Sequence, residues 1–574
     1  MNVPFPPTVR PVGFYRCILL TSSPSFLVPS GQVGGNQAVT TGGVASSSVN
    51  VTEGSGAYDD TSGGRTVRVL DPCTDDSCNW YEDTYAMPIN RWYPSLETLP
   101  DGDMIVLGGE MWGGFVTSDA QFNVPTYEFW PERGAPVNCS FLVDTMPANL
   151  YPLTWLLPNG LLFMQANWQT TLLNYTTAEE TRLPNITHAQ KTYPASGATT
   201  MMPLDPASNY SVNLLFCGGM DPELDSWDPY EWDIVNTDTS ASCVSINPMD
   251  ASPSWIEEDN LPENRGMGNF IILPDSRLFL ANGVAKGSAG YGNYSWPVNQ
   301  SFAQDPVLRP AYYNSKAASG SRWVTDGLPE STIGRLYHSS ATLLPDGSVF
   351  IAGSNPNADV ITEDNNPTYV YKTEYRAEIF YPDYYDAGRP TITGAPENLT
   401  YGGAYFDLAL DAGSLNGTDL SSIVVSVIRT GFSTHSMNMG MRQLILEHSY
   451  TGYSNGSATL HVAMPPPNAA LLVPGPVLFF VTVDGIPSQG TYAMLGSGVI
   501  EAQTMLAASV LPASSGNFKT TTPSSTGSST AKKTSTGSAA GASSTSAKST
   551  TSGAGKLAGG AVAALAGLAA VFAF

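Results

Sequence analysis

A short phrase that joins turn residues to an apolar run recurs along the first two thirds of the chain. Leu-Pro-Asp-Gly, or a close variant of it, is followed by DMIVLGG, LLFMQAN, RLFLANG and SVFIAGS. The four phrases begin at Leu99, Leu157, Leu273 and Leu344. Asp-Gly and Asn-Gly favour a tight hairpin, and an apolar run that stops at glycine predicts a buried strand with an abrupt end. Weaker copies of the strand, SVNLLFCGG and QAVTTGG, end at Gly219 and Gly43.

Recurrence of one hairpin unit every several tens of residues is typical of a kelch-like β-propeller. The spacing is uneven, so insertions are expected in the loops. A pair of stacked sheets is the rival interpretation, but it gives no reason for the repeated phrase. After Arg389-Pro390 the phrase disappears, and SSIVVSVIRTG, SATLHVAMP and GPVLFFVTVDG alternate in the manner of an antiparallel sandwich. We therefore expect an all-β chain with a propeller over residues 21–388 and a sandwich over residues 389–505.

The composition agrees with an all-β fold and excludes one class of partner. Of the 574 residues, 13% are charged, while 55 are Gly and 44 are Pro, which suits short strands joined by turns. The chain has 25 basic and 50 acidic side chains, a formal charge of −25, and no Lys/Arg cluster. Because such a chain repels phosphate backbones, nucleic-acid binding is excluded.

Both ends of the chain carry information about targeting. Residues 506–556 are expected to be a disordered Ser/Thr-rich stalk, because this composition cannot bury a core. The small-apolar run at 557–574, with small residues near 543–546, matches a GPI-attachment signal, and a tail anchor is the alternative. Residues 1–20 are irregular and lack the apolar stretch of a signal peptide, so we expect a damaged gene start.

Ten Asn-X-Ser/Thr sequons favour a secreted glycoprotein, although an Asn/Ser/Thr-rich composition would also produce them. They begin at Asn50, Asn138, Asn174, Asn185, Asn209, Asn293, Asn299, Asn398, Asn416 and Asn455. Among six cysteines, Cys73 and Cys78 predict a local disulfide, and a second bridge between Cys217 and Cys243 could close an acidic excursion. Zinc-ligand spacings are absent. We expect an extracellular protein, held at the plasma membrane or cell wall through a GPI anchor.

Two of the five histidines stand in unusual settings. RLYHSSATLLPDG places Tyr337 and His338 just before a blade strand, where side chains point to the axial mouth of a propeller. RWYPSLETLPDG places Tyr93 at the equivalent position of an earlier blade, and GFSTHSMNMGMR places His435 in a loop of the second domain that can reach the same mouth. Two imidazoles and two phenolates suit copper(II). Taken singly, each is also explained as a satisfied polar residue or a core-edge aromatic.

Several phrases together resemble the copper radical oxidases, specifically the glyoxal oxidases, with galactose oxidase as a more distant relative. They include VRVLDPCTDDSCNWYED, RWYPSLETLPDG, NLYPLTWLLPNG, GRLYHSSATLLPDGSVFIAGSNPN and FSTHSMNMG, within residues 66 to 505. The resemblance implies a seven-bladed propeller followed by an immunoglobulin-like sandwich. It also implies an oxidase that converts small aldehydes or primary alcohols with dioxygen and releases hydrogen peroxide, which peroxidases can use.

The resemblance assigns roles residue by residue. His338 and His435 become copper ligands together with Tyr93 and Tyr337. Tyr337 becomes the axial tyrosine that accepts the substrate proton, and Tyr93 the tyrosine that carries a radical. Trp112, in GGEMWGGF, resembles the indole that stacks over this radical, and a loop tryptophan packed on its own turn is the alternative.

The chain departs from the family at one cysteine. In the family, the radical tyrosine is joined through a thioether to a cysteine in a Phe-Cys phrase upstream of it. The stretch TSSPSFLVPSGQVGGNQAVTTGG has the character of that blade but no cysteine, and Cys17 lies just before it. Either a mis-joined exon has removed the partner, or Cys17 serves in a shifted register. With the partner removed, we expect weak or absent oxidase activity from this chain.

Two further classes of function compete with the oxidase. A non-catalytic propeller that binds wall carbohydrate would need none of Tyr93, Tyr337, His338 and His435. A glycoside hydrolase would need two carboxyl groups on either side of the scissile bond. Asp and Glu are plentiful, but nothing in the sequence singles out a pair.

Overall fold

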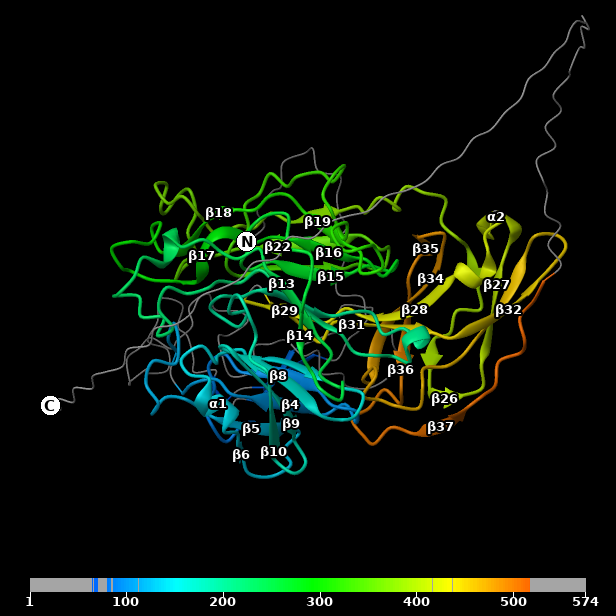
Figure 1. The fold of residues 1–574 in the computed structure, drawn as a ribbon, viewed down its shortest axis with the longest axis horizontal. Helices are drawn as coiled ribbons and strands as arrows, with labels where there is room; N and C mark the ends of the chain where they lie inside the picture. The colour runs from blue at the N-terminus through cyan, green and yellow to red at the C-terminus, as the bar shows by residue number, and fades with distance from the viewer. Residues whose placement is uncertain are drawn as a thin grey trace, which may run out of the picture. The chain divides into compact units, whose positions relative to one another are not determined.

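The computed structural model describes residues 64–65, 67–70, 80–83, 86–111, 113–415, 417–435 and 437–516, and all of them belong to one compact unit, Met1–Thr520 (Figure 1). Strands dominate this part of the chain. The helical segments found there are short: α1 (Phe141–Asp144), α2 (Ala412–Leu415), and the 3-10 turns η1 (Pro206–Ser208), η2 (Ile234–Asn236) and η3 (Leu420–Ser422). None of these has the length and apolarity needed to cross a bilayer.

Five antiparallel sheets follow one another along the chain, coloured blue to green in Figure 1. The first holds β3 (Ser95–Thr98), β4 (Met104–Leu107), β5 (Thr126–Trp130) and β6 (Val137–Asn138). The second holds β7 (Leu153–Leu156), β8 (Leu162–Ala166), β9 (Gln169–Asn174) and β10 (Glu179–Leu183), and the third β11 (Ala198–Met201), β12 (Leu214–Cys217), β13 (Cys243–Ile246) and β14 (Trp255–Glu257). The fourth holds β15 (Asn269–Ile272), β16 (Leu278–Ala281), β19 (Ala311–Tyr313) and β20 (Trp323–Val324), and the fifth β21 (Ser339–Leu343), β22 (Val349–Gly353) and β23 (Glu378–Phe380).

In each sheet the strands pair in chain order, which is the meander of a propeller blade. The pair β17 (Val284–Tyr291) and β18 (Ser301–Pro306) is inserted between β16 and β19, and β1 (Val67–Leu70) pairs with β2 (Trp80–Asp83). The predicted hairpins are therefore present, and the insertions lie in the connections. The described residues contain five blade sheets, so the number of seven blades stays a prediction.

One backbone position recurs at the entry to the first strand of every blade sheet. It lies six residues before the first residue of the turn phrase, or before Met202-Pro203 in the third blade. It is occupied by Tyr93, Tyr151, Ser196, Met267 and His338, with φ of 57°, 48°, 47°, 57° and 65°. Positive φ is uncommon outside glycine, and such conformations cluster at functional sites because the surrounding structure must enforce them.

The glycines that end the second strands allow close contact with the chain that enters the blade. A Cβ at Gly109 would lie 2.7 Å from the carbonyl oxygen of Trp92, and one at Gly219 would lie 2.1 Å from that of Gln190. Buried cations fasten the same strand ends in four blades. They donate to backbone carbonyls in the pairs Arg91–Gly108 (2.7 Å), Lys191–Gly218 (2.5 Å), Arg265–Asn282 (2.9 Å) and Arg335–Gly353 (2.8 Å).

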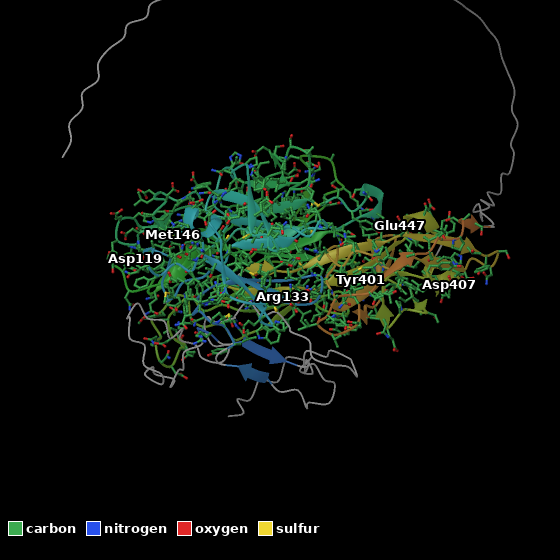
Figure 2. The ribbon with its side chains drawn as sticks, turned by 90° about the horizontal axis from the view of Figure 1, so that it is seen from below. Asp119, Arg133, Met146, Tyr401, Asp407 and Glu447 are labelled. Atoms are coloured by element: carbon green, nitrogen blue, oxygen red, sulfur yellow. A yellow bond between two sulfur atoms is a disulfide. The ribbon has the colours of Figure 1, made fainter. Side chains whose placement is uncertain are left out.

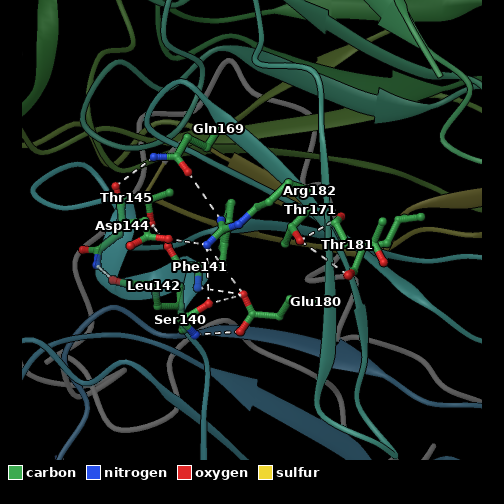
Figure 3. A network of polar contacts seen from close by, with 12 residues as sticks. Ser140, Phe141, Leu142, Asp144, Thr145, Gln169, Thr171, Glu180, Thr181 and Arg182 are labelled. Carbon is green, nitrogen blue, oxygen red and sulfur yellow. Dashed lines mark hydrogen bonds and ion pairs between the residues drawn. The ribbon is translucent and has the colours of Figure 1, made fainter. Parts of the chain in front are cut away.

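A short helix is held to the second blade by side chains. Glu180 of β10 accepts hydrogen bonds from the backbone N–H groups of Ser140 (2.6 Å) and Phe141 (2.8 Å) at the start of α1, and Arg182 pairs with Asp144 at its end (Figure 3). A carboxylate beside the free N–H groups of a helix start is stabilising. This network joins both ends of α1 to β10.

The sheets change character between β23 and β24. One sheet pairs β24 (Ile392–Thr393), β27 (Phe406–Leu410), β33 (Ala458–Val462), β32 (His448–Gly452) and β38 (Ser515–Gly516). The other pairs β25 (Asn398–Leu399), β36 (Thr491–Leu495), β34 (Gly475–Val483), β28 (Val424–Arg429) and β31 (Arg442–Leu446), with β35 (Ile486–Pro487) on β34. β26 (Tyr401–Gly403) pairs with β37 (Met505–Ala508), and Tyr401, labelled in Figure 2, donates its hydroxyl to the carbonyl of Leu472 at 2.9 Å. The sandwich is the second part of the predicted all-β fold, but β37 and β38 extend it to Gly516, so residues 506–516 belong to it and not to the stalk expected at 506–556.

A hairpin leaves the sandwich and enters the propeller. It comprises residues 430–441, between β28 and β31, and we refer to it as the finger. Its strands are β29 (Phe432–Thr434) and β30 (Met437–Met439). β29 packs against β21, and β30 packs against β11 and β15. These three partners are the first strands of three different blades. The finger therefore places His435 among residues of the propeller.

The turn phrases bind the sandwich. Three of their prolines accept hydrogen bonds on the backbone carbonyl, in the pairs Asn468–Pro158 (2.9 Å), Thr482–Pro274 (3.1 Å) and Gly490–Pro345 (2.8 Å). In the first phrase, Glu501 donates its N–H to the carbonyl of Asp101 at 2.9 Å. The repeated phrase thus forms the hairpin of each blade and also supplies acceptors for the second domain.

Candidate functional site

The four residues proposed as metal ligands come together in the structure. The hydroxyl oxygens of Tyr93 and Tyr337 are 3.2 Å apart. The ring centroid of His435 lies 4.2 Å from that of Tyr93 and 4.8 Å from that of His338, and the rings of Tyr337 and His338 stack at 3.8 Å. Tyr93, Tyr337 and His435 are buried, with 3%, 1% and 4% of their surface exposed. Residues from two blades and from the finger therefore meet at one place.

In each of the two imidazoles, one ring nitrogen makes a hydrogen bond that fixes the ring. Nδ1 of His338 lies 2.8 Å from the carbonyl oxygen of Asn355, and because a carbonyl only accepts, Nδ1 carries the proton. Nδ1 of His435 lies 2.7 Å from the hydroxyl oxygen of Thr434. Burial lowers the pKa of His338 to about 4, and burial together with His338 lowers the pKa of His435 well below its usual value. Both rings are therefore neutral at ordinary pH.

The other nitrogen of each ring has no partner. Nε2 of His338 and Nε2 of His435 are buried and make no hydrogen bond to any described group. In the other three histidines Nε2 does have a hydrogen-bond partner. It is Glu257 for His188, the carbonyl of Leu420 for His448, and Thr451 for His461. Buried polar atoms are nearly always paired, and a ring fixed through Nδ1 with a free Nε2 is the usual arrangement of a metal ligand.

The donor set fits copper better than other common metals. Within the described residues, no group of three or more His, Cys, Asp and Glu side chains could hold a metal, so further protein ligands beside the two imidazoles would be tyrosine oxygens. Burial raises the pKa of both Tyr93 and Tyr337 well above the ordinary value, so neither phenol ionises without a cation beside it. Two imidazole nitrogens with two phenol oxygens suit copper(II) in a tetragonal arrangement.

Aromatic rings enclose Tyr93 on three sides, and the sequence did not single them out. Trp92 stacks on its ring at 4.6 Å and an interplanar angle of 15°, and Tyr151 stacks at 4.8 Å and 24°. Tyr193 meets its edge at 5.5 Å and 88°. A signal for Tyr151 was present, because Tyr151-Pro152 precedes its turn phrase by the same interval as Tyr93-Pro94. Trp92 could be found only through its adjacency to Tyr93.

The remaining predicted residues lie elsewhere or outside the described part. Cys17 and Trp112 are not among the described residues, and neither are Cys73 and Cys78, so these assignments stay predictions. The bridge between Cys217 and Cys243 is confirmed. It joins β12 to β13 at residues that are direct partners in the register.

A third described cysteine is also separate from the site. Cys139 is a free, buried thiol in a core group with Tyr127 and Leu142, away from Tyr93. The other two described cysteines, Cys217 and Cys243, are bonded to each other. No cysteine within the described residues is therefore the thioether partner of Tyr93.

One buried carboxyl group lies near the site. Glu110 is 3% exposed, and burial raises its pKa to about 8. Its charge acts on Tyr193, the ring at the edge of Tyr93.

Comparison with known proteins gives a consistent result. The family model described as glyoxal oxidase N-terminus matches residues 33–384, and that of the galactose oxidase-like early set domain matches residues 389–495. The chain is 31% identical over 453 residues to the aldehyde oxidase GLOX of Vitis pseudoreticulata, covering 76% of this chain and 78% of that protein. It is 30% identical over 451 residues to the aldehyde oxidase GLOX1 of Arabidopsis thaliana, covering 75% and 68%.

A solved structure supports the fold. A fungal alcohol oxidase determined in complex with copper superposes with a TM-score of 0.54 at 17% identity, covering 76% of this chain and 82% of that one. At this level of identity the similarity concerns the fold alone.

Proposed function

The chain belongs to the glyoxal oxidase family of copper-dependent oxidases, and from this premise we propose that it oxidises small aldehydes or primary alcohols and passes the electrons to dioxygen. The observation that carries the proposal is the pair of buried, unpartnered Nε2 atoms of His338 and His435 beside the hydroxyls of Tyr93 and Tyr337. A carbohydrate-binding propeller has no use for such a donor set.

The reaction requires two electrons and two protons. An aldehyde hydrate loses both to become a carboxylic acid, and dioxygen takes up the same number to become hydrogen peroxide. A bound copper ion supplies a one-electron acceptor and acidifies the oxygen ligands around it. The second electron must be accepted by a side chain. We assign this role to Tyr93, which, once it has been oxidised to a phenoxyl radical, takes up that electron together with a proton and returns to the phenol.

The surroundings of Tyr93 support this role. Trp92 and Tyr151 both stack on its ring, and its exposed fraction is 3%, so water is kept from it. Stacked rings can spread unpaired electron density, and exclusion of water protects a radical from side reactions. In the family, a thioether to cysteine makes this phenol easier to oxidise. For this chain, Cys17 is the candidate partner.

Tyr337 is placed to move a proton. Its hydroxyl lies 3.2 Å from that of Tyr93, and burial together with the neighbouring tyrosines raises its pKa well above the usual value. As the phenolate it would be a strong base, and it would accept the proton of a substrate hydroxyl bound beside it. Tyr337 thus holds the proton, and Tyr93 takes the electron.

We place the protein outside the cell. Of the sequons in the described residues, Asn174 is half-buried, and the other seven are exposed, at Asn138, Asn185, Asn209, Asn293, Asn299, Asn398 and Asn455. Exposure is what glycosylation requires, and a disulfide between Cys217 and Cys243 suits an oxidising compartment. Treatment of the protein isolated from its native cells with N-glycosidase and with phosphatidylinositol-specific phospholipase tests both expectations.

Copper content tests the enzymatic proposal. The purified chain, loaded with copper(II) and dialysed, is expected to retain close to one copper per molecule. His338→Ala and His435→Ala should each lower this below about a tenth, because a missing ligand leaves an incomplete site. His461→Ala is the matched control, since both nitrogens of that ring already have partners on the sandwich. Equal copper retention in all four proteins would contradict the proposal.

Activity and mass complete the test. Peroxide release is expected with glyoxal, methylglyoxal or a primary alcohol, and comparing the three identifies the substrate class. A thioether appears in the intact mass as the loss of two hydrogen atoms. Copper retention without that loss, and with weak peroxide release, would indicate that the chain as written lacks the cysteine partner.

A further inference from the structure

Two arginines stand opposite each other at the base of the finger. Arg429 is the last residue of β28 and Arg442 the first of β31, and they are direct partners in the antiparallel register. Arg442 is 5% exposed. Like charges directly opposite each other destabilise a strand pair, so other interactions must offset their repulsion.

The arginines bind two different blades. Arg429 donates from Nη2 to the hydroxyl of Thr98 at 2.9 Å, and Arg442 donates from Nη2 to the carbonyl of Leu156 at 2.8 Å. Nη1 of Arg442 also donates to the carbonyls of Ala470 (2.9 Å) and Leu471 (3.2 Å) in the sandwich. Thr98 is the last residue of β3 and Leu156 the last of β7.

The same two strands also flank the tip of the finger. β3 begins two residues after Tyr93, and β7 begins two residues after Tyr151. The ring of His435 lies 4.2 Å from that of Tyr93 and 4.8 Å from that of Tyr151. Each strand is four residues long. The finger is therefore held at its base and at its tip by opposite ends of the same two short strands.

A buried carboxyl group balances the arginines. Glu97 of β3 is 3% exposed, and one of its oxygens has no hydrogen-bond partner among the described groups. Arg442 and Arg429 both act on its charge, in opposition to burial. Two cations and one carboxyl group thus lie where β3 meets the finger, with Arg442 and Glu97 buried and Arg429 partly buried. Removing one member of such a buried group is costly because the others lose their partner.

We propose that Arg429 and Arg442 are positioning residues that set how far the finger reaches into the propeller, and thereby the placement of the His435 imidazole against Tyr93. We refer to the pair as the arginine clamp. Among the described residues, the hydrogen bonds of the clamp go to Thr98, Leu156, Ala470 and Leu471, and none of these is a proposed metal ligand. Its importance follows from the demand for placement, since a shift of about 1 Å at a reacting group can cost roughly a hundredfold in rate. The effect on copper rests on the proposed function, whereas the effect on the finger does not.

Hydrogen exchange of the metal-free protein tests the clamp directly. In Arg442→Lys the charge is kept but one side chain cannot reach both Leu156 and the sandwich carbonyls. The amides of Phe432–Thr434 and Met437–Met439 are expected to exchange about tenfold faster than in the unaltered chain, as the loss of one charge-assisted hydrogen bond implies. Thr98→Val, which removes the acceptor of Arg429 at nearly constant shape, should act in the same direction.

A buried arginine that donates to carbonyls of the fourth blade, and not at the base of the finger, supplies the control. Arg265→Lys disturbs a guanidinium that donates to the carbonyls of Asn282 (2.9 Å) and Arg309 (2.7 Å). It should lower overall stability to a similar degree and leave the exchange of the finger unchanged. Faster exchange spread evenly over the blades in Arg442→Lys, or none in the finger of folded Thr98→Val, would overturn the proposal. If Arg442→Lys does not fold, the exchange of the finger amides in Thr98→Val alone tests the proposal.

Copper spectra provide the second measurement. Copper(II) bound to Arg442→Lys and to Thr98→Val should show altered electron paramagnetic resonance parameters and about tenfold weaker retention, while Arg265→Lys should match the unaltered chain. Unchanged spectra in both clamp variants would contradict a role in placing His435. If the unaltered chain takes up no copper, the proposed function fails, and the exchange experiment still judges the clamp.

Discussion

A single backbone position, repeated in five blades, provides much of the site. Tyr93, Tyr151 and His338 occupy it with positive φ, and two other blades place Ser196 and Met267 there. Because the conformation turns the chain sharply into the first blade strand, the side chain is presented at the end of the strand. The same position carries the proposed metal donors Tyr93 and His338 in two blades and the stacking ring of Tyr151 in a third, so blades of one backbone pattern present different side chains.

Lys191 is a buried residue whose contribution to the unfolding free energy depends on pH. It is fully buried, and its ammonium donates to the carbonyl of Gly218 (2.5 Å) and to the hydroxyl of Ser242 (3.1 Å). Burial lowers its pKa to about 7, although Glu257 acts in the opposite direction. Between pH 7 and its ordinary value of 10.5, the unfolded chain binds a proton that the folded chain does not.

The unfolding free energy of the protein is therefore expected to rise between pH 7 and pH 10.5. Lys191 contributes at most about 1.4 kcal/mol per pH unit to this rise. Lys191→Met should lack that rise. Urea unfolding of both proteins at pH 7 and pH 9 measures it. Parallel pH dependences in the two proteins would show that Lys191 keeps its ordinary pKa in the folded state.

Elements of this protein are joined by contacts at strand ends more than by long sheets. The blade strands are two to six residues long, and cations or a disulfide fasten their ends. The finger is the extreme case, because its two strands of three residues each are placed by the arginine clamp at one end and by aromatic rings at the other. Short elements of this kind keep their positions only through such end contacts.

The disulfide in the third blade has a measurable effect. Cys217→Ala/Cys243→Ala is expected to lower the unfolding free energy of the metal-free protein by about 3 kcal/mol, since the bridge closes a loop with a sequence separation of 26. Reductant should produce a similar loss in the unaltered chain and a smaller one in the double variant, which keeps only the short loop predicted between Cys73 and Cys78. Cys139→Ala is the control, because that thiol is free and should leave the sensitivity to reductant intact. A reductant-insensitive unaltered chain would argue against the assignment.

At the scale of the whole molecule, propeller and sandwich share one hydrophobic core. Leu150, Tyr193 and Leu204 of the blades belong to the same buried group as Val425 and Leu444 of the sandwich. The turn phrases add hydrogen bonds from Asn468, Thr482 and Gly490 of the sandwich. The finger also joins the two domains, because it leaves the sandwich and packs against strands of three blades.

We therefore expect the two domains to unfold together. Calorimetry of the metal-free protein should give one transition that coincides with the loss of tryptophan fluorescence, because exposing either domain uncovers the shared core. Asn468→Ala/Thr482→Val should move the whole transition to lower temperature without splitting it. Two resolved transitions in the unaltered chain would contradict a shared core.

The blades were predictable because their signals are local. Turn chemistry and the length of an apolar run act within about ten residues, so the Leu-Pro-Asp-Gly phrase predicted β4, β8, β16 and β22 directly. The entry residues were harder to recognise, since neither Tyr nor Ser is a residue type that favours the positive φ found at Tyr151 and Ser196. Resemblance to a family brought His435 into the site, whereas Trp92, Glu97 and the arginine clamp carried no motif.

The amino-acid sequence alone determined an all-β chain, the hairpins of its blades, the change of sheet type near residue 389, the acidic charge and four candidate ligands. The tertiary structure decided which rings enclose Tyr93, which nitrogens of His338 and His435 stay free, and how the finger is held. The reason is physical. Strands and turns arise from neighbours in the chain, while the site depends on contacts such as Arg442–Leu156 that join residues hundreds of positions apart.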